Sequence, residues 1–120
     1  MLLIAARVLL ISGLLHVIFG LMRFREPLLQ AVAEGFVGRF MHSDTRRLAF
    51  WFLLVGPMLV LLGQLSLQAI ERGDMGQIRT IGGYLLAAGV VGVLAFPKSP
   101  LWSLLPPALV FVAAGRGWLP

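Results

Sequence analysis

Apolar residues gather in four long blocks along the chain, and short polar stretches separate the blocks. The blocks cover residues 2–22, 48–70, 78–96 and 101–118. A membrane-crossing helix needs about 20 apolar residues to cover ~30 Å of hydrocarbon, and each block is close to that length. The pattern predicts an all-α fold in which a single domain forms an integral membrane four-helix bundle.

The fourth block differs from the others because it is shorter and contains two consecutive prolines. Pro106 and Pro107 each lack an amide proton, which disfavours regular helix around them. At the other end, Arg116 and Trp118 are residue types that anchor a span at the membrane interface. We therefore expect a fourth span with an irregular start.

The segment between the first two blocks, here called loop one (residues 23–47), has a helical periodicity of its own. At 100° per residue its apolar side chains fall on one half of a helical wheel and its polar side chains and glycines on the other. The apolar set is Leu28, Leu29, Val32, Ala33, Phe36, Val37 and Phe40. Pro27 suits a first helical turn. We predict an amphipathic interfacial helix over residues 27–41, in which Gly35 and Gly38 each cost about 1 kcal/mol relative to alanine.

Composition supports a membrane location. Hydrophobic residues make up 59% of the 120 residues and charged residues 12%, whereas a soluble domain carries about 25% charged residues. The net charge of +5 comes from basic residues that flank the apolar blocks, so lipid head groups rather than nucleic acid are the expected partners. Without cysteine the chain cannot form disulfides or zinc-thiolate sites.

Basic residues also predict an orientation. Six of the ten lie in loop one or in the loop before the fourth span, which places loop one in the cytoplasm and both termini outside. The other four lie toward the opposite face, so an inverted orientation and dual insertion stay open.

Small residues recur at helical spacing within the first three spans. Helices in lipid associate through close approach at such residues. Because four short helices enclose little interior, some of these stripes also fit a homodimer. The residues are Gly13 and Gly20, then Gly56 and Gly63, then Gly82, Ala88, Gly89 and Gly92.

His16 is the most informative polar residue, because it lies in the first span about 9 Å from the loop-one boundary at 1.5 Å per residue. An imidazole at that depth must be hydrogen-bonded or ligated. It can act as an acid or base, a proton relay or a haem ligand. Equally, a hydrogen bond to Ser12, to a backbone carbonyl or to Trp51 would lock the helices together.

Several residues are predicted to share the loop-one end of the bundle with His16. Ser12, Gly20, Trp51, Trp102 and Ser103 are the candidate ligand-binding residues. Glu34 is a candidate catalytic partner for His16 if the amphipathic helix folds over the mouth of the bundle. Its place on the polar half of the wheel favours a solvated glutamate instead.

A second polar set is predicted at the opposite end, and it has a structural explanation. Gln64, Gln68 and Glu71 follow one another on one stripe of the second span, and Arg7 lies near the same interface. We expect these side chains to bond between the first two spans. Tyr84 is placed in the same layer. No phosphate loop and no histidine pair with metal-ligand spacing is present, so neither a metal nor a cofactor is predicted.

Several motifs resemble a family of small four-span bacterial integral membrane proteins of unknown function. They are His16-x-x-x-Gly20, Glu34-Gly35-Phe36, Ala49-Phe50-Trp51-Phe52-Leu53 and the stretch from Pro97 to Pro107. The resemblance implies a location in the bacterial inner membrane and no assigned activity. The size is also similar to that of small multidrug resistance transporters, but the first span has no glutamate and loop one is longer than theirs.

The sequence leads to three functional hypotheses. The first is binding of a lipophilic small molecule in an intramembrane cleft, with isomerase-type or cyclase-type acid-base chemistry at His16. The second is a small proton-coupled exporter. The third is a structural or accessory membrane subunit in which the polar residues only hold helices together.

Overall fold

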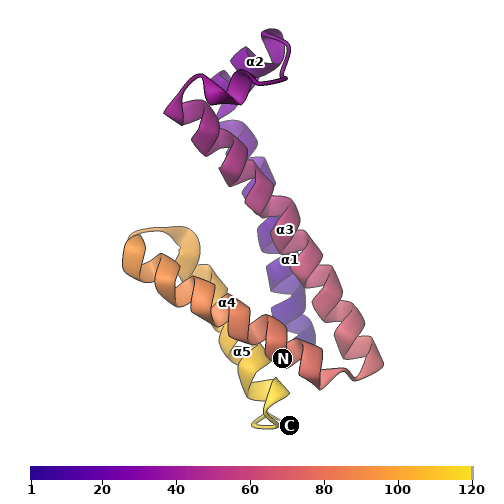
Figure 1. The fold of residues 1–120 in the computed structure, drawn as a ribbon. Coiled ribbons are helices and arrows are strands. Elements are labelled where there is room, and N and C mark those ends of the chain that lie inside the picture. Colours follow the sequence, from indigo (N-terminus) through magenta and orange to yellow (C-terminus); the bar gives the residue numbers. More distant parts are fainter. Residues whose placement is uncertain (120) are drawn as a thin grey trace. The chain divides into compact units, whose positions relative to one another are not determined.

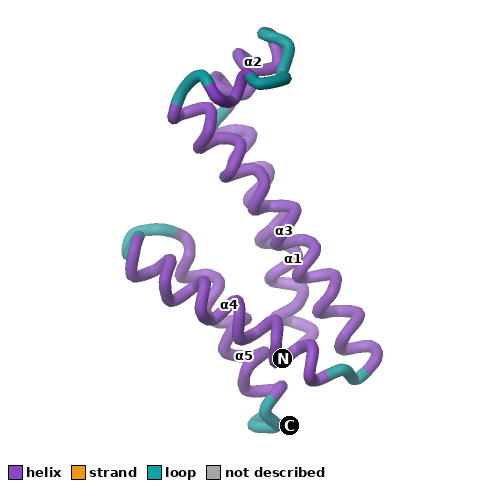
Figure 2. Tube along the Cα trace, in the orientation of Figure 1, coloured by secondary structure: helices purple, strands orange, loops and turns teal. Residues whose placement is uncertain are grey.

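The described residues of this computed structural model, 1–119 without the side chain of Pro100, form helices and loops and contain no strand (Figures 1 and 2). The elements in chain order are α1 (Leu2–Arg23), α2 (Arg25–Ala33), the 3-10 helix η1 (Arg39–Met41), α3 (Asp44–Arg72), α4 (Met75–Ala95), the 3-10 helix η2 (Pro100–Leu104) and α5 (Leu105–Gly115). The prediction of an all-α fold is confirmed.

Three of the helices, α1, α3 and α4, are long and apolar enough to cross a membrane. They contain 22, 29 and 21 residues and coincide with the first three apolar blocks, extended by a few residues at some ends. The fourth block differs from its predicted extent of 101–118. It consists of η2 followed by an α5 of 11 residues, because Pro106 and Pro107 occupy the first turn of α5, where their missing amide protons are tolerated.

The chain divides into two compact units, which are described separately. The first, called the loop unit, is Ile11–Val60, and the second, called the terminal unit, is Met1–Leu10 together with the chain from Leu61 onward.

In the loop unit, α1 and α3 approach one another closely at glycines. A Cβ atom added to Gly13 would lie 2.7 Å from the carbonyl oxygen of Gly56, and one added to Gly56 would lie 2.3 Å from a methyl group of Val17. At Gly20 an added Cβ would lie 2.7 Å from Leu53. The prediction that these glycines pack helices is therefore confirmed, because no larger side chain fits at these positions without moving the backbone or the neighbour.

The terminal unit packs in the same manner. Gly63 of α3 lies against Leu10 of α1, and Gly82 of α4 lies against Phe111 of α5. Phe111 and Ile78 are completely buried here. Ser66 is also completely buried, and its hydroxyl donates to the carbonyl oxygen of Leu62 at 2.7 Å.

The amphipathic helix ends earlier than its predicted extent of 27–41. The amide of Gly35 donates to the carbonyl of Val32, and the amide of Phe36 donates to the carbonyl of Ala31 at 2.8 Å. This pair of bonds is a Schellman motif, which needs a left-handed residue after the helix, and Gly35 has a φ of +106°. Helix α2 therefore ends at Ala33, and the chain turns through Gly38, with a φ of +71°, into η1.

Candidate functional site

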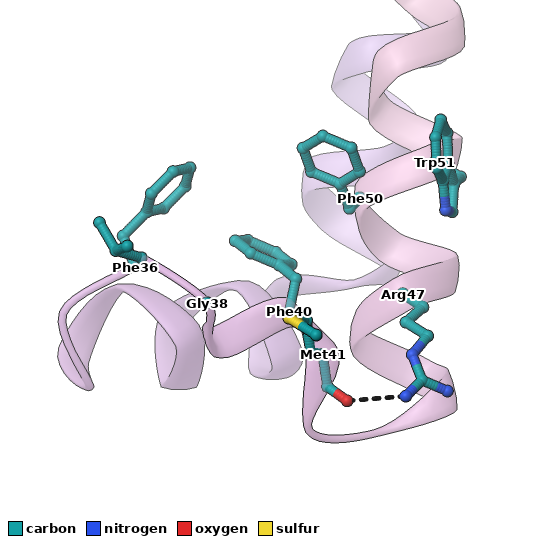
Figure 3. A pocket seen from close by; sticks show the side chains of 8 residues that line it. Phe36, Gly38, Phe40, Met41, Arg47, Phe50 and Trp51 are labelled. Atoms are coloured by element: carbon teal, nitrogen blue, oxygen red, sulfur yellow. Dashed lines mark hydrogen bonds between the residues drawn. The ribbon is translucent and has the colours of Figure 1, made fainter.

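An apolar groove of about 560 Å³ lies in the loop unit, between the turn after α2, η1 and the start of α3 (Figure 3). Its lining residues are Phe36, Val37, Gly38, Phe40, Met41, Arg47, Phe50 and Trp51. Most of these side chains remain exposed, including Trp51 at 62% and Met41 at 71%. A concave, mostly apolar surface with one charged group is the usual form of a small-molecule site.

Four aromatic rings form a continuous row along the groove. Phe36 contacts Phe40 edge-on at 5.2 Å between ring centroids, Phe40 contacts Phe50 at 5.5 Å, and Phe50 contacts Trp51 edge-on at 5.5 Å. Figure 3 shows these rings following one another from the loop to α3. Each spacing falls within the range in which aromatic pairs stabilise one another, by about 0.5–1.5 kcal/mol. The row therefore ties the turn after α2 to α3.

The backbone of Phe36 is held in an unfavourable conformation. Its φ is +68°, a left-handed value that is rare for a residue with a bulky side chain and costs on the order of 1–3 kcal/mol. The surrounding turn maintains it through the Phe36 amide bond to Ala31 and the bond from Arg39 to the Phe36 carbonyl at 3.1 Å. The strained residue is thus the one that places a ring at the outer end of the groove.

Arginines hold the loop against the start of α3. Arg46 forms an ion pair with Glu34 and also donates to the carbonyl of Arg39 at 3.0 Å. Arg39 donates through Nε to the carbonyl of Glu34 at 3.0 Å, at the end of α2. Arg47 donates to the carbonyl of Met41 at 2.8 Å and to the carboxylate of Asp44 at 2.9 Å. These bonds fix the position of the groove's loop side.

Glu34 is consequently the partner of Arg46, and no contact joins it to His16 among the described residues. The hydrogen bond from Arg46 is the main reason that the pKa of the Glu34 carboxyl lies below its ordinary value of 4.5, and the nearby charges of Arg39 and His42 act in the same direction. The side chain of Glu34 is half exposed, whereas that of Arg46 is only 12% exposed. Glu34 therefore neutralises a largely covered cation.

His16 is bound to α3. Its Nε2 lies 2.8 Å from the carbonyl oxygen of Phe52, and because a carbonyl only accepts, Nε2 carries the proton. The imidazole also stacks on the Phe52 ring, with 3.9 Å between centroids and 17° between planes. A hydrogen bond from His16 to a backbone carbonyl is one of the contacts between helices that the sequence analysis considered.

The other residues predicted at the loop-one end divide between the two units. Gly20 lies against Leu53 and Phe52, so the space at its face is filled by α3 side chains rather than left for a ligand. Ser12 is half-buried on α1, and Trp51 lines the groove. In the terminal unit, Trp102 donates to the carbonyl of Pro97 at 2.7 Å, and Ser103 lies beside it in η2.

The structure lacks the bonds that were expected between the second polar set on α3 and Arg7 on α1. Gln64, Gln68 and Glu71 are exposed on α3, and Arg7 is exposed on α1. None of them forms a hydrogen bond or ion pair with another described residue. The inward position on α3 belongs to Ser66, because small side chains face the packed neighbour while the long amides point away. Tyr84 on α4 is 77% exposed.

Sequence reasoning missed most of the groove. It placed Phe36 and Phe40 on the apolar side of a longer helix and gave no role to Met41 or Arg47. The available signal was Gly35, because a glycine directly after an apolar helical stretch is the usual end of a helix. A predicted helix that ends at Gly35 would have placed Phe36 and Phe40 in a loop near the start of α3.

Comparison with known proteins gives a family and no activity. A family model described as a family of unknown function, DUF6463, matches residues 3–118. The chain belongs to this family. No curated protein and no solved structure matches the DUF6463 chain. Among its described residues, no group of three or more His, Asp or Glu side chains is placed to hold a metal ion.

Proposed function

We propose that the DUF6463 protein is a multi-pass protein of the bacterial inner membrane that binds a lipophilic small molecule in the groove between loop one and α3. The row of four rings from Phe36 to Trp51 carries this proposal. These rings and the neighbouring Met41 present an exposed, concave apolar surface, and concavity with an apolar lining is the usual form of a small-molecule site.

The membrane location in this proposal rests on hydrophobicity. The mean hydropathy of the chain is +0.94, and α1, α3 and α4 have the length and composition of spans. We propose that η2 and α5 together form a fourth span, since the apolar stretch from Leu101 to Gly115 is continuous. Loop one would then lie at the membrane interface, where a lipophilic ligand reaches the groove from the bilayer.

His16 takes a positioning role in this proposal. Its hydrogen bond to Phe52 and its stacked ring fix the register of the α3 segment that carries Phe50 and Trp51. Since Nε2 is occupied by the Phe52 carbonyl and Glu34 by Arg46, the geometry supports ligand binding better than acid-base chemistry by these two residues.

The proposal is tested by identifying small molecules that co-purify with the protein in mild detergent. The groove variant is Phe40→Ala, which removes the central ring, and the control is Val91→Ala, which shortens a side chain 66% exposed on α4. We expect one defined lipophilic molecule in the wild type and the control, and its loss from Phe40→Ala. Bulk phospholipid alone in all three proteins would contradict the proposal and favour an exporter or an accessory subunit.

A further inference from the structure

Four exposed polar residues of the terminal unit, three on α3 and one on α1, have no role in the groove. Gln64, Gln68 and Glu71 are spaced by four and three residues on α3, so they form one stripe. Ser66, Ala69 and Leu59 occupy the buried side of the same helix. Leu61, 47% exposed, continues the outward stripe as an apolar flank.

Arg7 lies at the same level as this stripe. A Cβ atom added to Gly63 would lie 2.7 Å from the Cβ atom and 2.8 Å from the backbone of Leu10, so Leu10 and Gly63 are opposite one another in the packing of α1 and α3. The two helices run in opposite directions, and Arg7 precedes Leu10 by about one turn. This register places Arg7 level with the part of α3 between Gln64 and Gln68.

The inference rests on the proposed membrane location, because lipid chains supply no partner for an amide or a charge. In that setting two amides and a guanidinium that face lipid are costly, and Glu71 near the end of α3 adds a carboxylate to the same stripe. No described residue of the chain covers it. A group that covers the stripe would therefore come from another molecule.

Charge complementarity favours a second copy of the chain as that molecule. The stripe carries both signs, with Arg7 and Glu71, so it is complementary to itself under a two-fold axis along the membrane normal. Arg7 and Glu71 differ in level by about five residues, or ~7 Å along the helices, which an extended arginine side chain can reach. A glutamine amide both donates and accepts, so the glutamine side chains of two copies can pair with one another.

We propose that the α1–α3 face with Arg7, Gln64, Gln68 and Glu71 is the interface of a homodimer, in which Arg7 of each copy binds Glu71 of the other. The interface would remove the unpaired polar groups from lipid in both copies at once. It would lie in the terminal unit and use none of the groove residues.

Charge reversal separates pairing between chains from pairing within one chain. In the Arg7→Glu variant both charged positions of the proposed interface are acidic. In the Glu71→Arg variant both are basic. We expect each variant alone to dimerise about tenfold more weakly in nanodiscs, a change of ~1.4 kcal/mol. Mixing the two variants restores dimers, since the opposite stripes then face each other. The readout is subunit counting by single-molecule photobleaching, with Arg79→Glu as a charge-reversal control elsewhere in the terminal unit.

A wild type that is monomeric at all lipid-to-protein ratios would overturn the proposal. Dimers that persist unchanged in both single variants would overturn it as well, as would capture of a different protein in place of a second copy. If the reversed variants fail to fold, disulfide cross-linking of Gln68→Cys replaces them, because the natural chain has no cysteine. We expect Gln68→Cys to cross-link and Val91→Cys not to, and the reverse result overturns the interface.

Two measurements on the same membranes distinguish failure of the dimer proposal from failure of the proposed function. Release of the protein by alkaline carbonate would show that it does not span the membrane, which removes the reason for covering the stripe. A protein that resists extraction and retains its lipophilic molecule, but is monomeric, would leave the proposed function intact and reject the dimer.

Discussion

Nε2 of His16 donates a hydrogen bond to the carbonyl oxygen of Phe52 across 2.8 Å, and the two rings of these residues stack 3.9 Å apart. The carbonyl oxygen of Phe52 has two lone pairs, so it can accept from His16 as well as from the backbone amide in the next turn of α3. One α1 side chain thus contacts both the backbone and the side chain of a single α3 residue. Phe19 and Phe24 surround the same ring at 5.9 and 5.3 Å.

His16→Phe and His16→Ala separate the hydrogen bond from the stacked ring. His16→Phe keeps an aromatic ring and loses the bond, so we expect it to lower the free energy of unfolding by ~0.6 kcal/mol, the average for such bonds in membranes. His16→Ala also leaves a cavity and should cost about 2–4 kcal/mol. Denaturation in mixed SDS micelles measures both values. Equal losses in the two variants would show that the stacking contributes nothing.

Gly13→Ala tests the close approach of α1 and α3. The added methyl group would lie 2.6 Å from the amide nitrogen of Val60, so the helices must separate. We expect a loss of about 1–3 kcal/mol in the free energy of unfolding.

Gly83→Ala is the matched control for Gly13→Ala, because no atom lies within 4 Å of its added Cβ. In that open helical position alanine should be neutral or stabilising by up to ~1 kcal/mol. The same unfolding measurement compares the two variants, and a Gly13→Ala protein as stable as Gly83→Ala would contradict the packing.

The position of loop one should depend on pH through Glu34. Because its pKa is lowered in the folded protein, its stabilising effect is complete above the ordinary value of 4.5 and is lost as the pH falls through the lowered pKa. The aromatic row should therefore be intact from neutral pH down to the ordinary value and loosen only in stronger acid. Near-ultraviolet circular dichroism follows the rings, and Glu34→Gln should show the loosened spectrum already at neutral pH.

Phe36→Gly and Phe36→Ala should bind ligand equally poorly but differ in stability. Both remove the outer ring of the groove. Glycine adopts the positive φ of this position without strain, whereas alanine does not, so Phe36→Gly should be more stable than Phe36→Ala by about 1 kcal/mol. Thermal unfolding in detergent gives the comparison, and a more stable alanine variant would show that the backbone is not strained there.

The sequence predicted the regular part of the fold because apolar blocks and glycine spacing report on local and pairwise packing. The glycines at 13, 56 and 63 lie in the interfaces where their spacing placed them. Periodicity could not place the end of α2, since Phe36 and Phe40 continue the apolar half of the wheel beyond Gly35. The Schellman turn at Gly35 interrupts the helix although the hydrophobic pattern does not change there.

The candidate site was less predictable for a related reason. The depth of His16 correctly required a hydrogen bond, but a sequence does not tell which of several acceptors it meets. Gln64 and Gln68 were expected to face α1, yet the register set by Gly63 and Leu10 turns them outward. Which side of a helix packs depends on the partner's shape, and this information is not carried by one helix alone.

Trp51 offers the most direct test of the groove because its indole lies in the lining. A protein with Trp102→Phe and Trp118→Phe retains Trp51 as its one tryptophan. In nanodiscs, a brominated fatty acid added at low mole fraction quenches indole fluorescence on contact. A protein with Trp51→Phe and Trp102→Phe, which retains Trp118, reports on ordinary contact with the same lipid phase.

If the groove binds a lipophilic molecule, quenching of Trp51 should saturate and should be abolished by Phe40→Ala, whereas quenching of Trp118 should be weak and non-saturating. Quenching of Trp51 that is non-saturating and equal to that of Trp118 would contradict a binding site in the groove.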